Sequence, residues 1–236
     1  RYFDRMTAII QDRFGGYVNK FLGDGLFCLF GAPVAQADHA ARAIEAAIAC
    51  QQASGELNAE VAEAFGFEAG LSMRVGVVAG TAMVGNCGST ARMDYTAIGD
   101  CVNLASRMES ANKFLGTRIL VPHATWLAAG ELHASRYVGR IGIRGVDRVV
   151  AAREILIEAE PVEVSEAFTA AIAAYEAGQF AAAADQFEMI LKTRPDDVVS
   201  QRYAELAAVA EALDADAEWV LPEALTDGTV QFRDPR

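Results

Sequence analysis

A single carboxylate lies in a tight turn between two apolar segments near the start of the chain. Residues 17–22 (Tyr-Val-Asn-Lys-Phe-Leu) and 26–30 (Leu-Phe-Cys-Leu-Phe) are separated by Gly23-Asp24-Gly25. Asp-Gly between apolar segments is a favoured β-hairpin turn, so Asp24 has a purely structural interpretation. A carboxylate that projects from such a turn also suits Mg²⁺, a hard cation that prefers oxygen ligands. The residues alone leave both interpretations open.

A second pair of chemically capable residues lies on a predicted helix over 101–114. Asn103 and Arg107 are four residues apart and therefore share one face, while Leu104 and Met108 turn toward the core. An amide and a guanidinium would thereby be directed at one place. For such a pair in isolation, two solvated residues on a surface helix are the commoner case.

The hydrophobic pattern predicts the elements that must position these residues. Apolar residues at helical spacing predict helices over 2–14 and 37–65, the second loosened near Ser54-Gly55. Predicted strands, besides the hairpin, are 71–78, 83–85, 93–98, 118–121, 137–143 and 153–157. Interleaved strands, helices and hairpins favour an α+β fold over a parallel doubly wound sheet.

Ordered segments of the chain together resemble the catalytic domain of class III adenylate and guanylate cyclases. They are Lys20–Gly25 followed by Phe-Gly-Ala-Pro at 30–33, then 85–89 (Gly-Asn-Cys-Gly-Ser), 92–100 (Arg-Met-Asp-Tyr-Thr-Ala-Ile-Gly-Asp) and 102–109 (Val-Asn-Leu-Ala-Ser-Arg-Met-Glu). The resemblance covers about residues 2 to 157. It implies a ferredoxin-like cyclase palm with a mixed or antiparallel sheet and helices, in a catalytic domain over 1–157.

The resemblance also implies roles for individual residues. Asp24 would bind the two Mg²⁺ (or Mn²⁺) ions of each active site, which activate the ribose 3′-hydroxyl and hold the triphosphate. Asn103 would position the ribose, and Arg107 would stabilise charge on the α-phosphate while pyrophosphate leaves. Arg144 occupies the position of a Lys that contacts phosphate in the family, so a cation is retained there.

Lys20 and Thr96 occupy the two positions that select the base in this family. Adenine N1 is a hydrogen-bond acceptor and matches the Lys20 ammonium, whereas guanine presents donors and would require a carboxylate. Thr96 can accept from the adenine amino group, so the predicted substrate is ATP rather than GTP. In having Thr at this position, the chain is similar to a bacterial subclass that includes bicarbonate-responsive enzymes. Lys20 taken alone is equally an exposed strand lysine.

The resemblance further implies that catalysis takes place in a head-to-tail homodimer. One protomer supplies the metal ligands and the other supplies the base-selecting and transition-state residues, so a monomer should be inactive. The family's first metal-binding Asp lies on a strand upstream of a helix like 2–14, and no residue of this chain corresponds to it. We therefore expect the chain to be an N-terminally incomplete form of a longer protein.

Three hypotheses about function follow. The chain is an adenylate cyclase that makes cyclic AMP and pyrophosphate, or a catalytically silent cyclase-like module for regulation or dimerisation. In the third hypothesis, its main function is protein interaction through a C-terminal helical extension. A guanylate cyclase is a variant of the first that Lys20 disfavours.

The C-terminal third differs in composition from the rest. Residues 1–155 are electrically neutral, and 156–236 carry the whole net charge of −12. Residues 162–215 resemble a tetratricopeptide repeat with one further helix, a predicted all-α extension with a protein partner, and 216–236 form a predicted irregular acidic tail. Without clustered Lys and Arg, we expect no nucleic-acid binding.

The spacing of the cysteines and the hydropathy of the chain indicate the cellular compartment of the protein. The four cysteines, Cys28, Cys50, Cys87 and Cys101, are far apart, which favours reduced thiols in a cytoplasmic protein. No stretch reaches the about 18 apolar residues of a membrane helix. An anchor in an upstream region would place the domain at the cytoplasmic face of a membrane.

Overall fold

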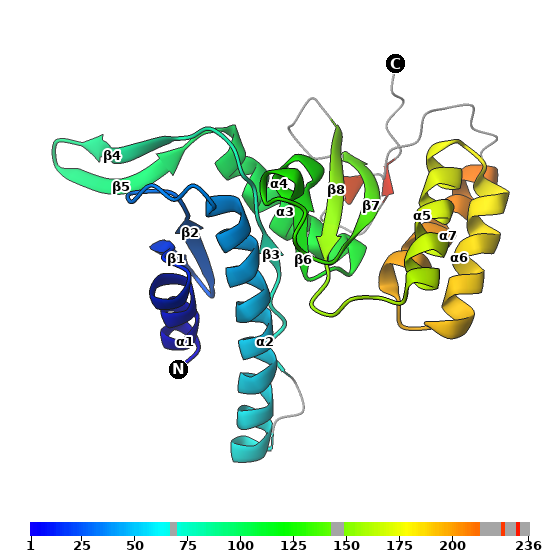
Figure 1. The fold of residues 1–236 in the computed structure, drawn as a ribbon, viewed down its shortest axis with the longest axis horizontal. Helices are drawn as coiled ribbons and strands as arrows, with labels where there is room; N and C mark the ends of the chain where they lie inside the picture. The colour runs from blue at the N-terminus through cyan, green and yellow to red at the C-terminus, as the bar shows by residue number, and fades with distance from the viewer. Residues whose placement is uncertain (67–69, 143–148, 213–222, 225–229, 232–236) are drawn as a thin grey trace. The chain divides into compact units, whose positions relative to one another are not determined.

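The computed structural model describes residues 1–66, 70–142, 149–212, 223–224 and 230–231. The chain divides into two compact units. Unit 1 comprises residues 1–109 and 124–132, and unit 2 comprises residues 110–123 and 133–236. Helix α3 (Asp100–Leu115) contributes residues to both. Figure 1 shows the elements of each unit.

In unit 1, a β-hairpin packs against two helical segments. Helix α1 (Tyr2–Ala8) continues into the π-helical segment η1 (Ile9–Arg13), and the strands of the hairpin are β1 (Tyr17–Leu22) and β2 (Gly25–Leu29). The long helix α2 (His39–Phe65) completes this packing. The apolar cluster between them contains Met6, Ile10, Cys50 and Ala53, with Val18, Leu26, Cys28 and Phe30 packed against it. The hairpin therefore has a rigid support.

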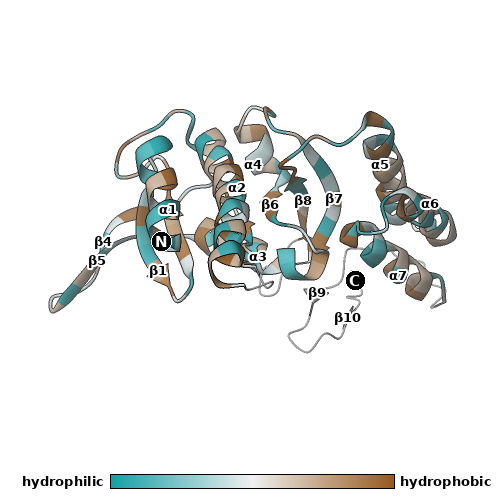
Figure 2. Cartoon of the chain, turned by 90° about the horizontal axis from the view of Figure 1, so that it is seen from below, coloured by the Kyte–Doolittle hydropathy of each residue, from teal (hydrophilic) through white to brown (hydrophobic). Residues whose placement is uncertain are grey.

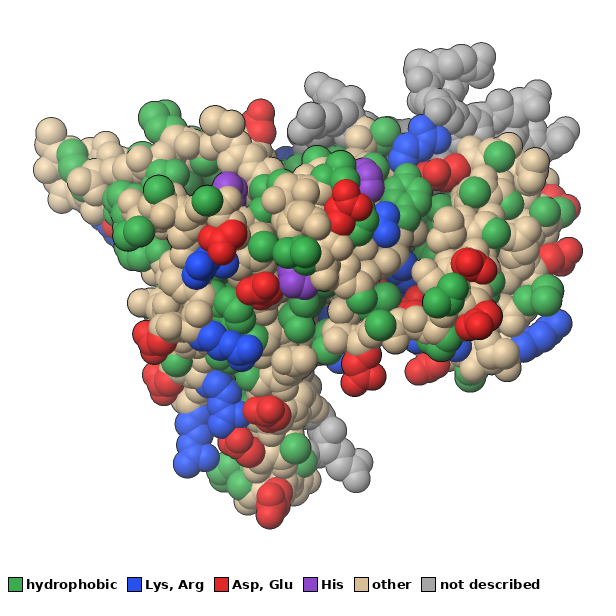
Figure 3. Space-filling model, viewed as in Figure 1, with side chains coloured by type: hydrophobic (Ala, Val, Ile, Leu, Met, Phe, Trp, Pro, Cys, Tyr) green, Lys and Arg blue, Asp and Glu red, His purple; other side chains and the backbone are tan. Residues whose placement is uncertain are grey.

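Helix α2 is continuous through Ser54-Gly55, so the predicted loosening near these residues is wrong. Ala53 and Leu57 are buried on either side, and Ser54 is itself buried. A helical Gly costs only about 1 kcal/mol relative to Ala, which packing of this length of helix offsets. Hydrophobic and hydrophilic residues alternate around α2 in Figure 2, as expected of a helix with one buried face. Over the region of α2, Figure 3 shows basic and acidic side chains interspersed.

A two-stranded ribbon precedes α3. Strands β4 (Met83–Ser89) and β5 (Arg92–Ile98) pair antiparallel along their whole length, with Gly85 opposite Thr96 (Figure 1). The short strand β3 (Val75–Gly76) and helix α4 (His123–Ala128) also lie largely in unit 1. Arg74 Nε donates to Glu109 Oε1 at 2.9 Å, which ties the segment before β3 to α3.

Unit 2 contains an antiparallel sheet and a helical bundle. Strands β6 (Ile119–Pro122) and β7 (Ser135–Gly142) each pair antiparallel with β8 (Val149–Ile155). Helices α5 (Val162–Glu176), α6 (Phe180–Thr193) and α7 (Val198–Ala212) pack in sequence, α5 on α6 and α6 on α7. Strands β9 (Glu223–Ala224) and β10 (Val230–Gln231) form a short antiparallel pair within 216–236, most of which lies outside the described residues.

Aromatic side chains form the core of the helical bundle. Phe168, Tyr175, Phe187 and Tyr203 are all fully buried. Tyr203 stacks on Phe187 with ring centroids 5.1 Å apart and meets Tyr175 edge-on at 5.0 Å. Its hydroxyl donates to the carbonyl of Val138 in β7 at 2.6 Å. A Cβ at Gly139 would lie 2.2 Å from this hydroxyl, and the φ of Gly139 is +89°, so only glycine fits there.

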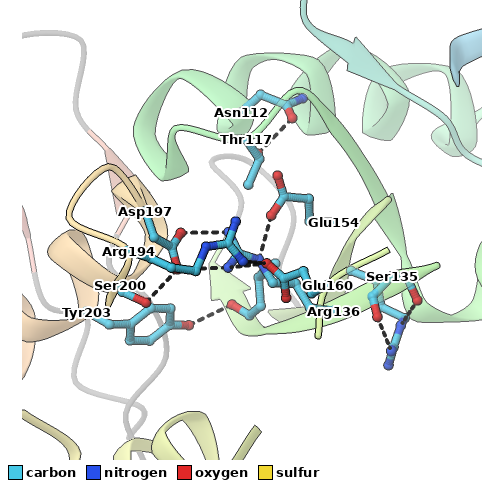
Figure 4. A network of polar contacts seen from close by, with 12 residues as sticks. Asn112, Thr117, Ser135, Arg136, Glu154, Glu160, Arg194, Asp197, Ser200 and Tyr203 are labelled. Atoms are coloured by element: carbon cyan, nitrogen blue, oxygen red, sulfur yellow. Dashed lines mark hydrogen bonds and ion pairs between the residues drawn. The ribbon is translucent and has the colours of Figure 1, made fainter. Parts of the chain in front are cut away.

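A buried ion cluster joins the bundle to the sheet (Figure 4). Arg136 of β7 contacts both carboxylate oxygens of Asp197, at 2.9 and 2.8 Å, and donates from Nε to Glu154 of β8 at 2.7 Å. Glu160 accepts from Arg136 and from Arg194. The Arg136 side chain is 7% exposed. The helices thus form part of one compact unit with the sheet. Two predictions remain predictions: the boundary between 157 and 162, and the likeness to a tetratricopeptide repeat.

The ion cluster should make stability depend on pH. Burial opposes ionisation of Asp197, but hydrogen bonds from Arg136 and Ser200 outweigh it and hold the pKa of Asp197 below its usual value. A depressed folded-state pKa stabilises the fold above the unfolded value of about 3.9, and this contribution is lost as pH falls through the folded pKa. Burial raises the pKa of Glu154 as well, and there it outweighs the lowering effect of Arg136, so the pKa of Glu154 is raised.

We therefore expect Asp197→Asn to be less stable at pH 7 and to lose less stability than the wild type between about pH 5 and pH 2. Urea unfolding followed by circular dichroism at several pH values measures this. Asp196→Asn, at the exposed neighbouring residue, is the matched control and should retain the wild-type pH dependence. Parallel pH profiles for Asp197→Asn and the wild type would contradict the prediction.

Among the described residues, no helix has both the length and the apolar character needed to cross a membrane.

Candidate active site

The hairpin presents Asp24 to solvent at its tip. Leu22 pairs with Gly25, so Gly23 and Asp24 form a two-residue loop, and Gly23 has a φ of +66°. Gly-Asp is a favoured loop of this length because glycine reaches positive φ without strain. Asp24 is exposed, and its hairpin rests on the apolar cluster below. The carboxylate is therefore held in place by the backbone and is free to bind a ligand.

The donor chemistry of this tip fits one part of a magnesium site. Mg²⁺ is commonly held by one or two carboxylates together with substrate phosphates and waters, and an exposed carboxylate on a rigid turn meets that need. Among the described residues, no group of three or more His, Cys, Asp or Glu side chains could hold a metal ion. Asp24 would thus be one ligand of an ion that the substrate helps to bind.

Helix α3 presents Asn103 and Arg107 on one side and buries the other. Leu104 is 8% exposed and Met108 is fully buried, as the sequence predicts. Asn103 is exposed and Arg107 is half-buried. The Nη1 atom of Arg107 is shielded from solvent and has no hydrogen-bond partner among the described residues. A shielded guanidinium nitrogen without an acceptor is costly, so this atom is available for an anion or a partner group.

Thr96 of β5 is joined to β1 through a residue that sequence reasoning missed. The Thr96 hydroxyl donates to Oδ1 of Asn19 at 3.2 Å, and Nδ2 of Asn19 donates to the carbonyl of Tyr95. Tyr17 and Tyr95 meet edge-on with centroids 5.6 Å apart, which also holds the two strands together. Asn19 directly precedes Lys20, so the structure brings Thr96 next to the strand that carries Lys20. The only sequence signal was a neutral polar residue beside Lys20 in a segment whose other residues are apolar.

Among the described residues, Asp24 lies in the hairpin loop, whereas Asn103 and Arg107 lie on α3. Among the described residues, no hydrogen bond or ion pair links Asp24 to Asn103 or Arg107. Arg144 lies outside the described residues, so its predicted phosphate contact stays a prediction. The roles assigned to Lys20, Thr96, Asn103, Arg107 and Asp24 likewise remain predictions.

Two of the cysteines lie close to the hairpin and have no catalytic character. Burial raises the pKa of Cys28 to about 12 and that of Cys50 to about 11, and a charge on Cys50 would further raise the pKa of Cys28 and of Tyr2. Both therefore remain protonated near neutral pH and act as small apolar groups of the cluster. All four cysteines are free.

Comparison with known proteins identifies the family. The model of the adenylate and guanylate cyclase catalytic domain matches residues 1–153. The chain belongs to this family. The match includes Lys20, Asp24, Thr96, Asn103 and Arg107, and it confirms the resemblance inferred from the sequence.

Relatives of the cyclase domain include two bacterial adenylate cyclases. Adenylate cyclase 1 of Rhizobium meliloti is 33% identical over 170 residues, which are 72% of this chain and 25% of that protein. An adenylate cyclase of Anabaena cylindrica is 33% identical over 150 residues, 61% of this chain and 29% of that protein. The chain thus spans about a quarter of the length of these relatives.

Solved cyclase structures confirm the fold. The adenylyl cyclase CyaB from P. aeruginosa superposes with a TM-score of 0.60 at 34% identity, covering 66% of this chain and 78% of that one. The guanylyl cyclase Cya2 gives a TM-score of 0.58 at 33% identity, covering 68% and 79%. The predicted α+β cyclase palm is confirmed. Because one neighbour is an adenylyl and the other a guanylyl cyclase, the fold does not decide between ATP and GTP.

Proposed function

We propose that the chain is the catalytic domain of an adenylate cyclase, which converts ATP to 3′,5′-cyclic AMP and pyrophosphate at the interface of a head-to-tail homodimer. The observation that carries the choice of ATP is the junction of β1 and β5, where Asn19 connects Thr96 to the strand of Lys20. An ammonium for adenine N1 and a hydroxyl for the adenine amino group are the two contacts that this base requires.

The reaction joins the ribose 3′-oxygen to the α-phosphorus and breaks the bond from that phosphorus to the pyrophosphate oxygen. The proton of the 3′-hydroxyl leaves to solvent or to a substrate phosphate. Asn103 would hold the ribose so that the 3′-oxygen is in line with the leaving group. Arg107, whose Nη1 is shielded and unpaired among the described residues, would stabilise negative charge on the α-phosphate. Asp24, and Arg144 by resemblance, would hold the triphosphate end.

Two Mg²⁺ or Mn²⁺ ions, when bound, would favour ionisation of the 3′-hydroxyl and neutralise the triphosphate. The family requires two carboxylates for them, and Asp24 supplies one.

Complementation between two inactive variants tests both the activity and the shared site. We expect Asp24→Ala and Arg107→Ala each to lose cyclic AMP formation when assayed alone in the longest natural chain containing these residues. Mixed and allowed to exchange subunits, they should recover about a quarter of wild-type activity, because about half of the dimers are mixed and each has one intact site.

The outcomes separate the hypotheses. Cyclic AMP from ATP in the wild type, with recovery on mixing, supports the dimeric adenylate cyclase. Recovery of cyclic GMP instead would identify a guanylate cyclase, and activity without recovery would contradict the shared site. A dimeric wild type that makes neither product with Mg²⁺ or Mn²⁺ would identify a silent regulatory module.

A further inference from the structure

Asn19 is the extra residue of a β-bulge in the strand that carries Lys20. In the β1–β2 hairpin, Val18 pairs with Cys28 and Lys20 with Phe27, so no residue of β2 lies opposite Asn19. A bulge redirects the side chain of the unpaired residue and strengthens the local twist. Here the half-buried Asn19 side chain contacts β5 rather than β2.

The hydrogen bonds of Asn19 fix the direction of the Thr96 hydroxyl. A backbone carbonyl can only accept, so the carbonyl of Tyr95 requires the NH₂ group of Asn19 on its side. The amide oxygen of Asn19 then faces Thr96, and because this oxygen can only accept, the Thr96 hydroxyl must donate to it. The one hydrogen of the hydroxyl is thereby used, and its oxygen is left with acceptor capacity alone.

We propose that Asn19 is a positioning residue that makes Thr96 an obligate hydrogen-bond acceptor and so selects a nucleotide base with an exocyclic amino group at this point. This inference rests on the proposed function, in which Thr96 faces the base. The amino group of adenine donates to such an acceptor. Guanine carries a carbonyl oxygen at the equivalent position, and two acceptors facing each other cannot form a hydrogen bond.

Without Asn19, Thr96 would lose this selectivity. A hydroxyl whose hydrogen is free can donate to the guanine carbonyl as readily as it accepts from adenine. The edge-to-face contact of Tyr17 with Tyr95 does not involve Asn19 and should keep β1 against β5 in its absence. Lys20 would retain its own preference for adenine, so selectivity falls but does not vanish.

The test compares kcat/KM for ATP and for GTP in the wild type, Asn19→Leu, Thr96→Val and the double variant. We expect Asn19→Leu to lower the ATP to GTP ratio about tenfold, the effect of one hydrogen bond with a mismatched partner. In the Thr96→Val background, Asn19→Leu should leave the ratio unchanged, because the hydroxyl it orients is absent.

Asn58→Leu is the matched control. Asn58 of α2 also bonds to backbone through its amide, donating to the Leu71 carbonyl at 2.9 Å and accepting from the Leu71 amide at 2.6 Å. It lies outside the base site, so the ratio should be unchanged in this variant. Equal losses of kcat/KM for both nucleotides in Asn19→Leu would show a purely structural role and overturn the inference, as would an equal loss of selectivity in the Thr96→Val background.

Direct binding of ATP and GTP, measured by titration calorimetry, separates this inference from the proposed function. If the wild type makes no cyclic nucleotide but its preference for ATP in binding falls in Asn19→Leu, the proposed activity fails and the inference holds. If cyclic AMP is made and Asn19→Leu keeps the full preference, only the inference fails. A wild type that binds neither nucleotide overturns both.

Discussion

Asp24→Asn is expected to lower cyclic AMP formation about a thousandfold, since a metal ligand in such a site supplies several kcal/mol of transition-state stabilisation. Asparagine keeps the shape of the side chain but removes the negative charge that would hold the cation. Gly-Asn is as good a hairpin loop as Gly-Asp, so the turn at the tip of β1 and β2 should be unchanged. Product formation from ATP with Mg²⁺ and with Mn²⁺, measured by chromatography, gives the result.

Asp12→Asn is the control for this prediction. Asp12 is an exposed carboxylate on η1, a helical segment adjoining the hairpin, and it should be replaceable without loss of activity. The free energy of unfolding of both variants, measured by thermal denaturation, should match that of the wild type within about 0.5 kcal/mol, as is usual for surface substitutions. Activity of Asp24→Asn within tenfold of the wild type would show that the carboxylate is part of the turn and not a metal ligand.

Arg136→Met is expected to destabilise unit 2 by about 3–5 kcal/mol, the typical result of breaking a buried ion pair by removing one partner. Its guanidinium contacts Glu154, Glu160 and Asp197, whose side chains are only 12%, 6% and 3% exposed. Burial alone would lower the pKa of Arg136, but the hydrogen bonds that it donates to Asp197 and the three negative charges raise it above its usual value. Without Arg136, these carboxylates would face one another, with Arg194 as the remaining counter-charge among the described residues.

Arg202→Met is the matched control for the ion cluster. Arg202 of α7 pairs with Glu205 at 3.1 Å, but the two side chains are 45% and 66% exposed. Exposed pairs of this kind contribute about 0–1 kcal/mol. The free energies of unfolding of the two variants, measured in urea at pH 7, should therefore differ clearly. A free energy of unfolding for Arg136→Met within 1 kcal/mol of the control would contradict a stabilising role for the cluster.

The cluster connects the start of α7 to β7 and β8. The helical extension therefore packs against the sheet of unit 2. Tyr137 and the amide of Arg140 both donate to Glu176 of α5, at 2.9 and 3.0 Å, which adds a second polar junction. Deleting 162–236 to test for a protein partner would remove these contacts to β7 and leave Arg136 without Asp197. Substitutions on exposed positions of α6, such as Met189, are the appropriate test of the predicted partner.

Local sequence was sufficient to predict the hairpin, the buried face of α3 and the cyclase family. The two-residue loop at Gly23-Asp24 follows from turn propensity between apolar strands. The spacing of Leu104 and Met108 against Asn103 and Arg107 fixes which face of α3 is buried, because helical periodicity depends only on neighbours in the chain. The ordered segments through 109 were specific enough to indicate the cyclase family.

Contacts between distant residues were decided by the tertiary structure. The bonds from Asn19 to Tyr95 and Thr96 span more than 70 positions and arise because a bulge turns one side chain of β1 toward β5, which no local propensity encodes. Arg136 and Asp197 are 61 positions apart, and their sequence context is that of ordinary surface charges. Such charges become a buried cluster only when β7, β8 and the loop before α7 converge. Periodicity reports which face of an element is apolar, whereas the partner that covers this face depends on how the whole chain packs.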